Sequence, residues 1–186
     1  DADCIVQENF TIDLFPIPEA DFYVDSIVRV NSVVSPTNQS KSDISWYWNF
    51  DNNSSSVDEN PSVIYEYQDY YTITLTVFNT YGCSDNTSSE VFAVNDLALY
   101  IPNSFTPNND LKNESFKVSI MNHNTFEISI FDRFSELLYN SDNENEGWDG
   151  TYKGKAVQNG TYVVKIYATD LFGKVFKQTK TIHLIR

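Results

Sequence analysis

One stretch of regular alternation in the middle of the chain constrains the fold most. Every second residue from Tyr71 to Val77 is aromatic or aliphatic, and threonines stand between them. Because successive side chains of a β-strand point to opposite faces, this pattern places an apolar row against a core and a threonine row toward water. The stretch therefore predicts a half-buried strand of the kind that builds β-sandwiches.

Similar runs recur along all 186 residues, and clusters of Asn, Asp, Ser, Pro or Gly separate them. They predict strands near residues 9–15, 22–24, 27–34, 44–50, 62–66, 71–79, 89–95, 97–101, 115–120, 125–131, 136–140, 161–169 and 174–184. The 12 tyrosines and 13 phenylalanines favour strands, whereas good helix formers are scattered. We therefore expect an all-β protein of two small domains.

Charge divides the chain at the same place as its length suggests. Residues 1–96 hold two basic against sixteen acidic side chains, whereas residues 97–186 hold ten of each. Within the second half, residues 151–186 carry seven basic side chains against one aspartate. The asymmetry predicts a domain boundary near residue 96, and the net charge of −14 argues against nucleic-acid binding.

The chain offers little for catalysis or redox chemistry. Only Cys4 and Cys83 are present, without a CxxC pair, and His123 and His183 have no serine–acid partners at a recognisable spacing. No apolar run approaches the roughly 20 residues of a membrane-spanning helix, so we expect a soluble segment of a longer protein that is not itself membrane-spanning. We do not expect an enzyme.

The segment before residue 16 has two interpretations. Cys4 is echoed 79 positions later by Cys83, and residues 10–13, which follow Cys4, are paralleled by residues 91–94, which follow Cys83. Residues 1–15 are therefore either the tail of a preceding repeat or the first strand of the first domain. A Cys4–Cys83 disulfide would fit the second interpretation, and a repeat would instead place the two cysteines one module apart.

Several segments of the first half occur in a characteristic order: WYWNFDN at 46–52, ENP at 59–61, YEY at 65–67, YTITLTVFN at 71–79 and GC at 82–83. Together they make residues 16–96 resemble a PKD (polycystic kidney disease) domain, which is an immunoglobulin-like β-sandwich. Asn49 stands where the family usually has an aspartate, and residues 51–53 replace the usual glycine turn. The resemblance implies the fold and no particular ligand.

A longer series of segments fills residues 97–186: YIPNSFTPNND at 100–110, NESF at 113–116, ISIFDRFSE at 128–136, WDG at 148–150, KGK at 153–155, NGTY at 159–162 and IHLIR at 182–186. This series resembles the gliding-motility-associated C-terminal domain, which is the type B sorting domain of the Bacteroidota type IX secretion system. The two resemblances together imply two immunoglobulin-like β-sandwich domains in series.

The resemblance implies a function for the whole chain. Sorting domains of this type send cell-surface proteins, large gliding adhesins among them, across the periplasm and through the outer membrane, either to the surface or into the medium. The implied partners are the type IX translocon with its shuttle proteins and a PorP/SprF-type outer-membrane protein. The alternative from another class is an adhesion module, in which Trp46 or Tyr47 binds a glycan or the first domain acts as a structural spacer.

One loop of the second half has the side chains of a calcium site. Asn108, Asp110, Asn113 and Glu114 supply closely spaced oxygen ligands of the kind that Ca²⁺ prefers. The alternative is a solvated turn, because Asn109 and Leu111 stand where the resembled family has glycines. Ca²⁺ is the one cofactor that the residues suggest.

The end of the chain predicts a basic hairpin. Tyr162, Val164, Ile166 and Ala168 are expected on one face, and residues 170–173 form a turn before the chain returns. An exposed edge of this hairpin can accept a partner strand, and its cations can meet acidic groups. The predicted contact residues are Lys174, Lys177, Lys180, His183 and Arg186. Lysines at strand edges also deter aggregation, which is the alternative interpretation.

Overall fold

The computed structural model describes residues 16–42 and 44–186. The predicted strand at 9–15, the first segment at 1–15 and Cys4 lie outside the described residues. The chain divides into two compact units between Val94 and Asn95. All regular elements of the described residues are β-strands, so the expected all-β class is confirmed.

The first unit builds one large sheet from its longest strands. Its strands are β1 (Phe22–Tyr23), β2 (Ile27–Arg29), β3 (Val33–Val34), β4 (Thr37–Asn38), β5 (Ser45–Asn49), β6 (Ser55–Ser56), β7 (Val63–Ile64), β8 (Asp69–Phe78) and β9 (Ser84–Val94). The five-stranded sheet has the order β2-β9-β8-β5-β6, and two-stranded pairs β1-β4 and β3-β7 accompany it. Only β2 and β9 run parallel in that sheet.

The alternation in β8 does what its pattern predicts. Ile73, Leu75 and Val77 are fully buried, whereas the intervening threonines lie on the other face. Trp48 on β5 stands opposite Leu75 and fills the centre of this core. Its indole N–H donates to the carbonyl of Asp58 at 2.9 Å, so the buried ring leaves no unpaired donor.

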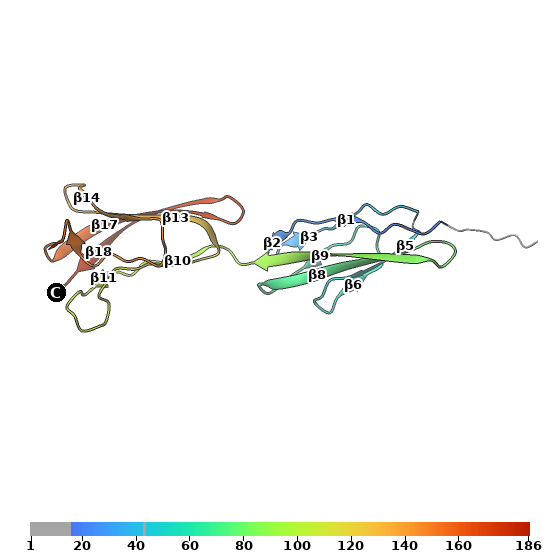
Figure 1. Ribbon diagram of the computed structural model, residues 1–186, viewed down its shortest axis with the longest axis horizontal. Coiled ribbons are helices and arrows are strands. Elements are labelled where there is room, and N and C mark those ends of the chain that lie inside the picture. The colour runs from blue at the N-terminus through green and yellow to red at the C-terminus, as the bar shows by residue number, and fades with distance from the viewer. Residues whose placement is uncertain (1–15, 43) are drawn as a thin grey trace, which may run out of the picture. The chain divides into compact units, whose positions relative to one another are not determined.

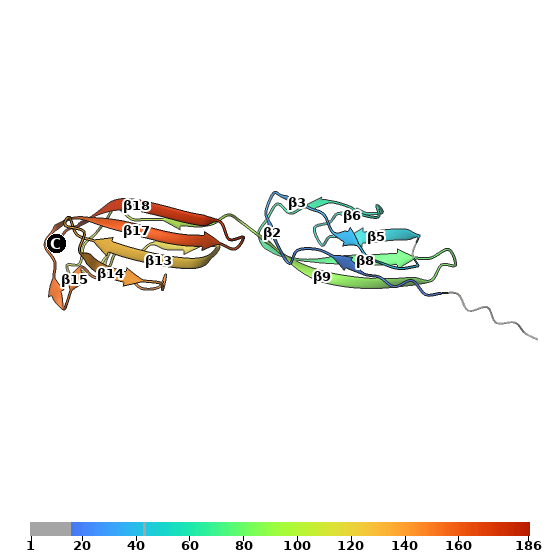
Figure 2. The same ribbon diagram turned by 90° about the horizontal axis from the view of Figure 1, so that it is seen from above.

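The second unit repeats this arrangement. Its strands are β10 (Ala98–Tyr100), β11 (Ser104–Phe105), β12 (Ser119–Met121), β13 (His123–Phe131), β14 (Leu137–Ser141), β15 (Thr151–Tyr152), β16 (Lys155–Ala156), β17 (Gly160–Asp170) and β18 (Val175–Leu184). The five-stranded sheet has the order β11-β18-β17-β13-β14, with β11 parallel to β18. Figure 2 shows β18, β17, β13 and β14 side by side.

A second layer closes the core of this unit. The two-stranded β10-β12 pair lies opposite β13 (Figure 1), and apolar side chains from both layers form one cluster. Trp148 joins them from outside the strands, where its backbone bonds to Phe116 in both directions. Its indole N–H donates to the carbonyl of Thr151 at 2.8 Å. The core therefore holds the start, middle and end of the unit together.

Candidate functional site

The long β17–β18 hairpin is the predicted contact region, and its register is continuous from Gly160↔Leu184 to Thr169↔Val175. Tyr162, Val164, Ile166 and Ala168 all face the core, which confirms the predicted alternation. Asp170 is buried at the turn, and its Oδ1 accepts the amides of Phe172 and Lys174 at 2.9 and 2.8 Å. The turn is thus fixed by a carboxylate that is held within the fold.

Four of the five predicted contact residues are exposed, and three of them, Lys174, Lys177 and His183, belong to this hairpin. The ammonium of Lys177 lies 5.5 Å from the ring centre of Tyr167, and that of Lys174 lies 5.0 Å from Phe176. His183 shares a hydrogen bond of 3.1 Å with Thr161. Cations over aromatic rings are held in place while remaining open to solvent. These three residues are therefore open to solvent, and their role as contact residues remains a prediction.

The other two are engaged inside the domain. The Lys180 ammonium donates to the carbonyl of Ile101 at 2.8 Å. The Arg186 guanidinium donates to the carbonyls of Val157 at 2.6 Å and Gly150 at 2.9 Å. The structure therefore separates the predicted set into three residues on the hairpin surface and two residues whose cations bind distant backbone carbonyls.

Lys165 belongs to the same surface and was missed by sequence reasoning. It is exposed on β17, and its ammonium lies 4.9 Å from the ring centre of Phe131 on β13. The alternation that buries Val164 and Ile166 already directs Lys165 outward, so the pattern contained the information. We call Lys165, Lys174, Lys177 and Tyr167 the basic face.

The predicted calcium loop is organised by its own carboxylates. Glu114 accepts the amides of Asn109 and Leu111, one on each oxygen, both at 3.0 Å. Asp110 accepts the amide of Lys112 at 2.8 Å and the side-chain amide of Asn108 at 3.2 Å. Residues 109, 111 and 113 all have positive φ. Such alternating backbone forms a concave set of N–H groups that suits an anion, and here the anion is Glu114 itself.

The loop therefore explains the glycines of the resembled family. Leu111 has φ of 69° and is 92% exposed, although a branched side chain disfavours that backbone conformation. No cluster of three or more His, Cys, Asp or Glu side chains in residues 16–42 and 44–186 is arranged to hold a metal. Calcium binding by Asn108, Asp110, Asn113 and Glu114 remains a prediction.

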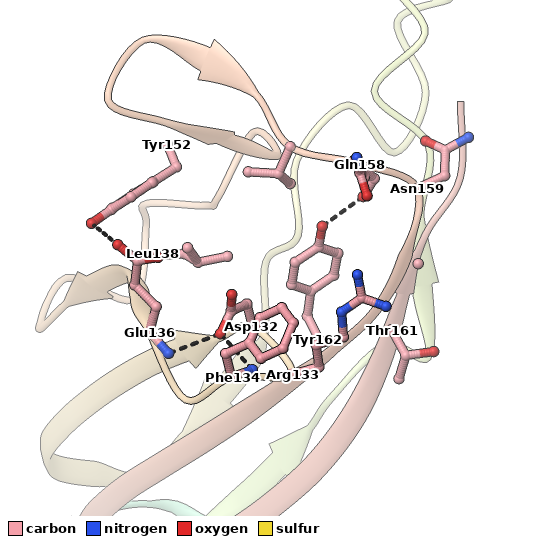
Figure 3. A pocket seen from close by; sticks show the side chains of 12 residues that line it. Asp132, Arg133, Phe134, Glu136, Leu138, Tyr152, Gln158, Asn159, Thr161 and Tyr162 are labelled. Carbon is pink, nitrogen blue, oxygen red and sulfur yellow. Dashed lines mark hydrogen bonds between the residues drawn. The ribbon is translucent and has the colours of Figure 1, made fainter.

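A pocket of about 310 Å³ opens beside the start of β17, where Thr161 and Tyr162 line it (Figure 3). Leu138, Val157 and Tyr162 supply apolar lining. Its two carboxylates already have internal roles, since Asp132 accepts the amides of Phe134 and Glu136, both at 2.8 Å, and Glu136 accepts the Tyr152 hydroxyl at 2.9 Å.

The Tyr162 hydroxyl donates to the carbonyl of Gln158 at 2.6 Å. Burial raises the pKa of Tyr162, and the nearby Arg186 opposes that rise. Both phenols that line this pocket, Tyr152 and Tyr162, therefore donate to neighbouring loops and brace them.

Comparison with known families gives each unit an identity. Residues 99–181 match the model of the CHU_C type IX secretion signal domain, and residues 16–94 match that of the PKD domain. The second unit is a type IX secretion signal domain. The first is a PKD domain, and neither family is enzymatic.

Solved structures with similar folds include two PKD1 domains. One comes from the metalloprotease PrtV of Vibrio cholerae (27% identity, TM-score 0.38, 42% of this chain and 98% of that one). The other comes from Epp of Vibrio anguillarum (26% identity, TM-score 0.39, 44% and 98%). Latent PorU from Porphyromonas gingivalis is 14% identical over 90% of this chain and 20% of its own (TM-score 0.33). The search of curated proteins found no match.

The secretion signal domain fixes the destination of the protein. A type IX signal implies interaction with that secretion system and export to the cell surface or into the medium. Among the described residues, no helix has the length and apolar character needed to cross a membrane.

In the PKD domain, Cys83 is half-buried and its amide donates to the Asn79 side chain at 2.9 Å. Its pairing with Cys4 remains a prediction.

Proposed function

We propose that the secretion signal domain is read as a folded unit by the type IX translocon, its shuttle proteins and a PorP/SprF-type outer-membrane partner. The basic face of the β17–β18 hairpin is the contact surface. One observation carries this proposal: Lys165 on β17, Lys174 in the turn and Lys177 on β18 are all exposed, and the structure gives none of the three an ion pair among the described residues. Such a surface favours an acidic partner.

The packing of residues 182–186 supports recognition as a folded unit. Ile182 and Leu184 are buried in the core, and Arg186 bonds to two loops that precede the hairpin. The last residues therefore do not form a detachable tail. Deleting them would unfold the domain, so loss of export after such a deletion cannot locate the contact.

Charge reversal on the folded surface is the sharper experiment. A fluorescent reporter with an inner-membrane export signal is fused ahead of the complete chain and expressed in a type IX-competent bacterium, with a translocon deletion strain as control. We expect surface or secreted reporter with the native chain, and at least tenfold less when Lys165, Lys174 and Lys177 are changed together to Glu. The matched control changes Lys112, Lys153 and Lys155 to Glu, and these three residues are also exposed.

The two variants separate a surface effect from a folding effect. Both carry the same change in net charge, and their melting temperatures report whether the fold is kept. Normal export of the hairpin variant would contradict the basic face as the contact. Periplasmic retention of the native chain would contradict the sorting function itself.

The PKD domain is proposed to be the last spacer of a surface adhesin. A glycan-binding role has one observation in its favour: Tyr47 is 45% exposed in a hollow that Asn49, Asn53 and Ser55 also line. Trp46 is half-buried and packs against the core, so it offers less surface for such a contact than Tyr47. A glycan array with the native chain and Tyr47→Ala distinguishes the two roles, because a spacer gives no Tyr47-dependent signal.

A further inference from the structure

The β18 strand has one side that is almost entirely unpaired. On its β17 side, backbone pairing runs the full length of the strand. On the other side, β11 pairs only with His183 and Leu184. Within the described part of the chain, no strand pairs with residues 175–181 on that side, and Figure 2 shows β18 at the margin of its sheet.

Hydrogen bonds at the paired end show which residues face outward. The amide of His183 donates to Asn103, and that of Ile185 donates to Phe105, so odd-numbered residues direct their backbone groups away from β17. The carbonyl of Lys174 accepts the Asp170 amide, which fits even-numbered residues facing β17. Backbone directions alternate along a strand. The outward groups of the open stretch therefore belong to Val175, Lys177, Thr179 and Thr181.

Among the described residues, the open stretch has neither a proline nor a bulge that would protect it from an incoming strand. Proteins usually protect an open edge with a proline, a bulge or a lysine that projects into the approach path. The register of β18 has no bulge, and its residues include no proline. The Lys177 ammonium lies over Tyr167 on the neighbouring strand and so is directed away from the edge, and Lys180 is bound to Ile101, in the segment that leads to β11.

The side chains beside the edge select the chemistry of the occupant. Val175, Lys177, Thr179 and Thr181 are exposed, and they would flank the side chains of an added strand. Lys177 sits in the middle of this row, with Lys165 on the next strand over. A carboxylate opposite Lys177 is therefore favoured, and β-branched side chains suit the valine and threonine positions.

We infer that β18 accepts an extended acidic segment of the secretion machinery as an added strand along residues 175–181, with a Glu or Asp side chain opposite Lys177. This inference rests on the proposed sorting function and names how its contact is made. Backbone pairing supplies the attraction, and Lys177 supplies the preference for an acidic strand.

Proline substitution tests the edge without breaking the sheet. The Thr179 amide points outward, so Thr179→Pro removes a donor that β17 does not use and places a ring in the path of the added strand. The matched control is Asn86→Pro on β9 of the PKD domain. Phe92 donates its amide to Ser26 outside the β8–β9 ladder, so even-numbered β9 residues also face outward. Thr179→Ala controls for loss of the side chain.

In the export assay with the complete chain, we expect Thr179→Pro to reduce surface reporter at least tenfold, while Thr179→Ala and Asn86→Pro export normally. All variants must keep the native melting profile, and Val175→Pro, at the first residue of β18 and also with an outward amide, replaces Thr179→Pro if that variant does not. Normal export of folded Thr179→Pro, with the native chain also exported, would overturn the inference and leave the sorting function standing.

A second measurement needs no secretion at all. Amide hydrogen exchange on the complete chain should show fast exchange at Lys177 and Thr179 and slow exchange at Gln178 and Lys180. The probe is the acetylated, amidated peptide TVTETVT, and its twin TVTKTVT replaces the central Glu with Lys. We expect the acidic peptide to slow exchange at residues 177 and 179 at least fivefold, and the basic twin to have no effect. Equal protection by both peptides, or by neither, would overturn the inferred occupant.

Discussion

The PKD domain and the secretion signal domain share an architecture and differ in almost everything exposed. Position by position, the order β2-β9-β8-β5-β6 matches β11-β18-β17-β13-β14, and the outer parallel pair occupies the same place in both. Each core contains a tryptophan whose ring meets another aromatic edge-on at 5.1 Å. The apolar pattern therefore specifies the same sandwich architecture in both units.

The difference lies along the corresponding last strands. On β9 the exposed residues include Ser84, Asn86, Ser88 and Glu90, whereas β18 presents valine, lysine and threonines. The same backbone thus carries an acidic, polar surface in one unit and a basic, β-branched surface in the other. Residues that distinguish the two units in function are therefore expected on the outer faces and edges, because the inner faces are occupied by core packing.

The largest expected effects come from removing the two tryptophans. Trp48 and Trp148 are at most 1% exposed, and each donates its indole N–H to a carbonyl. Replacement of either by Ala should cost about 3 to 5 kcal/mol of the free energy of unfolding of its own domain. Urea unfolding followed by circular dichroism measures both.

The export assay compares the same two tryptophan variants by function. Trp148→Ala should abolish export, and Trp48→Ala should leave it largely intact, because the family match places the signal in the second unit. Equal export loss in both variants would mean that the PKD domain is part of the signal. Equal export in both would mean that the fold of the second domain is not what the machinery reads.

The next effect concerns a glycine that the PKD domain does not reproduce. Gly150 has φ of 77°, and an added Cβ would lie 2.6 Å from Leu184 Cδ1 and 2.9 Å from Arg186 Nη2. Gly173 has φ of 80° with open space around it. We expect Gly150→Ala to cost about 3 kcal/mol, from backbone strain and crowding together, and Gly173→Ala about 1 kcal/mol from strain alone. Thermal melts of the two variants compare them, and equal losses would show that crowding at the chain end is unimportant.

Local sequence patterns predicted the fold, whereas contacts between residues far apart in the sequence determine which of the predicted site residues are already bound within the domain. Alternation identified β8 and the β17–β18 hairpin because each periodic run contains its own information. Lys180 and Arg186 resembled surface cations, yet the carbonyls that they bind belong to residues 79, 36 and 29 positions away. No local pattern reports such partners. The sequence therefore could not distinguish the cations that bind backbone carbonyls, Lys180 and Arg186, from those that do not, such as Lys177.

A smaller effect of opposite sign is expected in the loop held by Glu114. Leu111 keeps φ of 69°, whereas the PKD domain uses Asn53 at φ of 63°. Asparagine tolerates this conformation better than leucine does. Leu111→Gly should therefore raise the free energy of unfolding by about 1 kcal/mol, and Asn53→Gly should change it by less than half as much. A gain at Asn53 that equals the gain at Leu111 would remove backbone strain as the explanation.

Calcium gives the same loop an independent test. If Asn108, Asp110, Asn113 and Glu114 bind Ca²⁺, then 1 mM Ca²⁺ raises the melting temperature of the second domain and a chelator reverses the shift. The matched variant is Asp110→Asn, which keeps the size of the side chain. An identical melt of the native chain in Ca²⁺ and in chelator would eliminate the site.

The smallest effect separates the buried tyrosines of the two cores. Burial raises the pKa of Tyr65, with Tyr71 and Asp51 adding to the rise, whereas Arg186 opposes the rise at Tyr162. A folded-state pKa above the unfolded value of about 10 means that the stability contribution is complete below pH 10 and is lost as pH rises above it. At pH 10 the loss from Tyr65 is about 0.4 kcal/mol, since half of the unfolded tyrosines are then ionised. Tyr65→Phe should flatten the decline in melting temperature between pH 9 and 10.5, and Tyr162→Phe should flatten it less because its phenolate is partly stabilised by Arg186. An equal response in both variants would show that burial alone, without Arg186, sets the alkaline behaviour of the two cores.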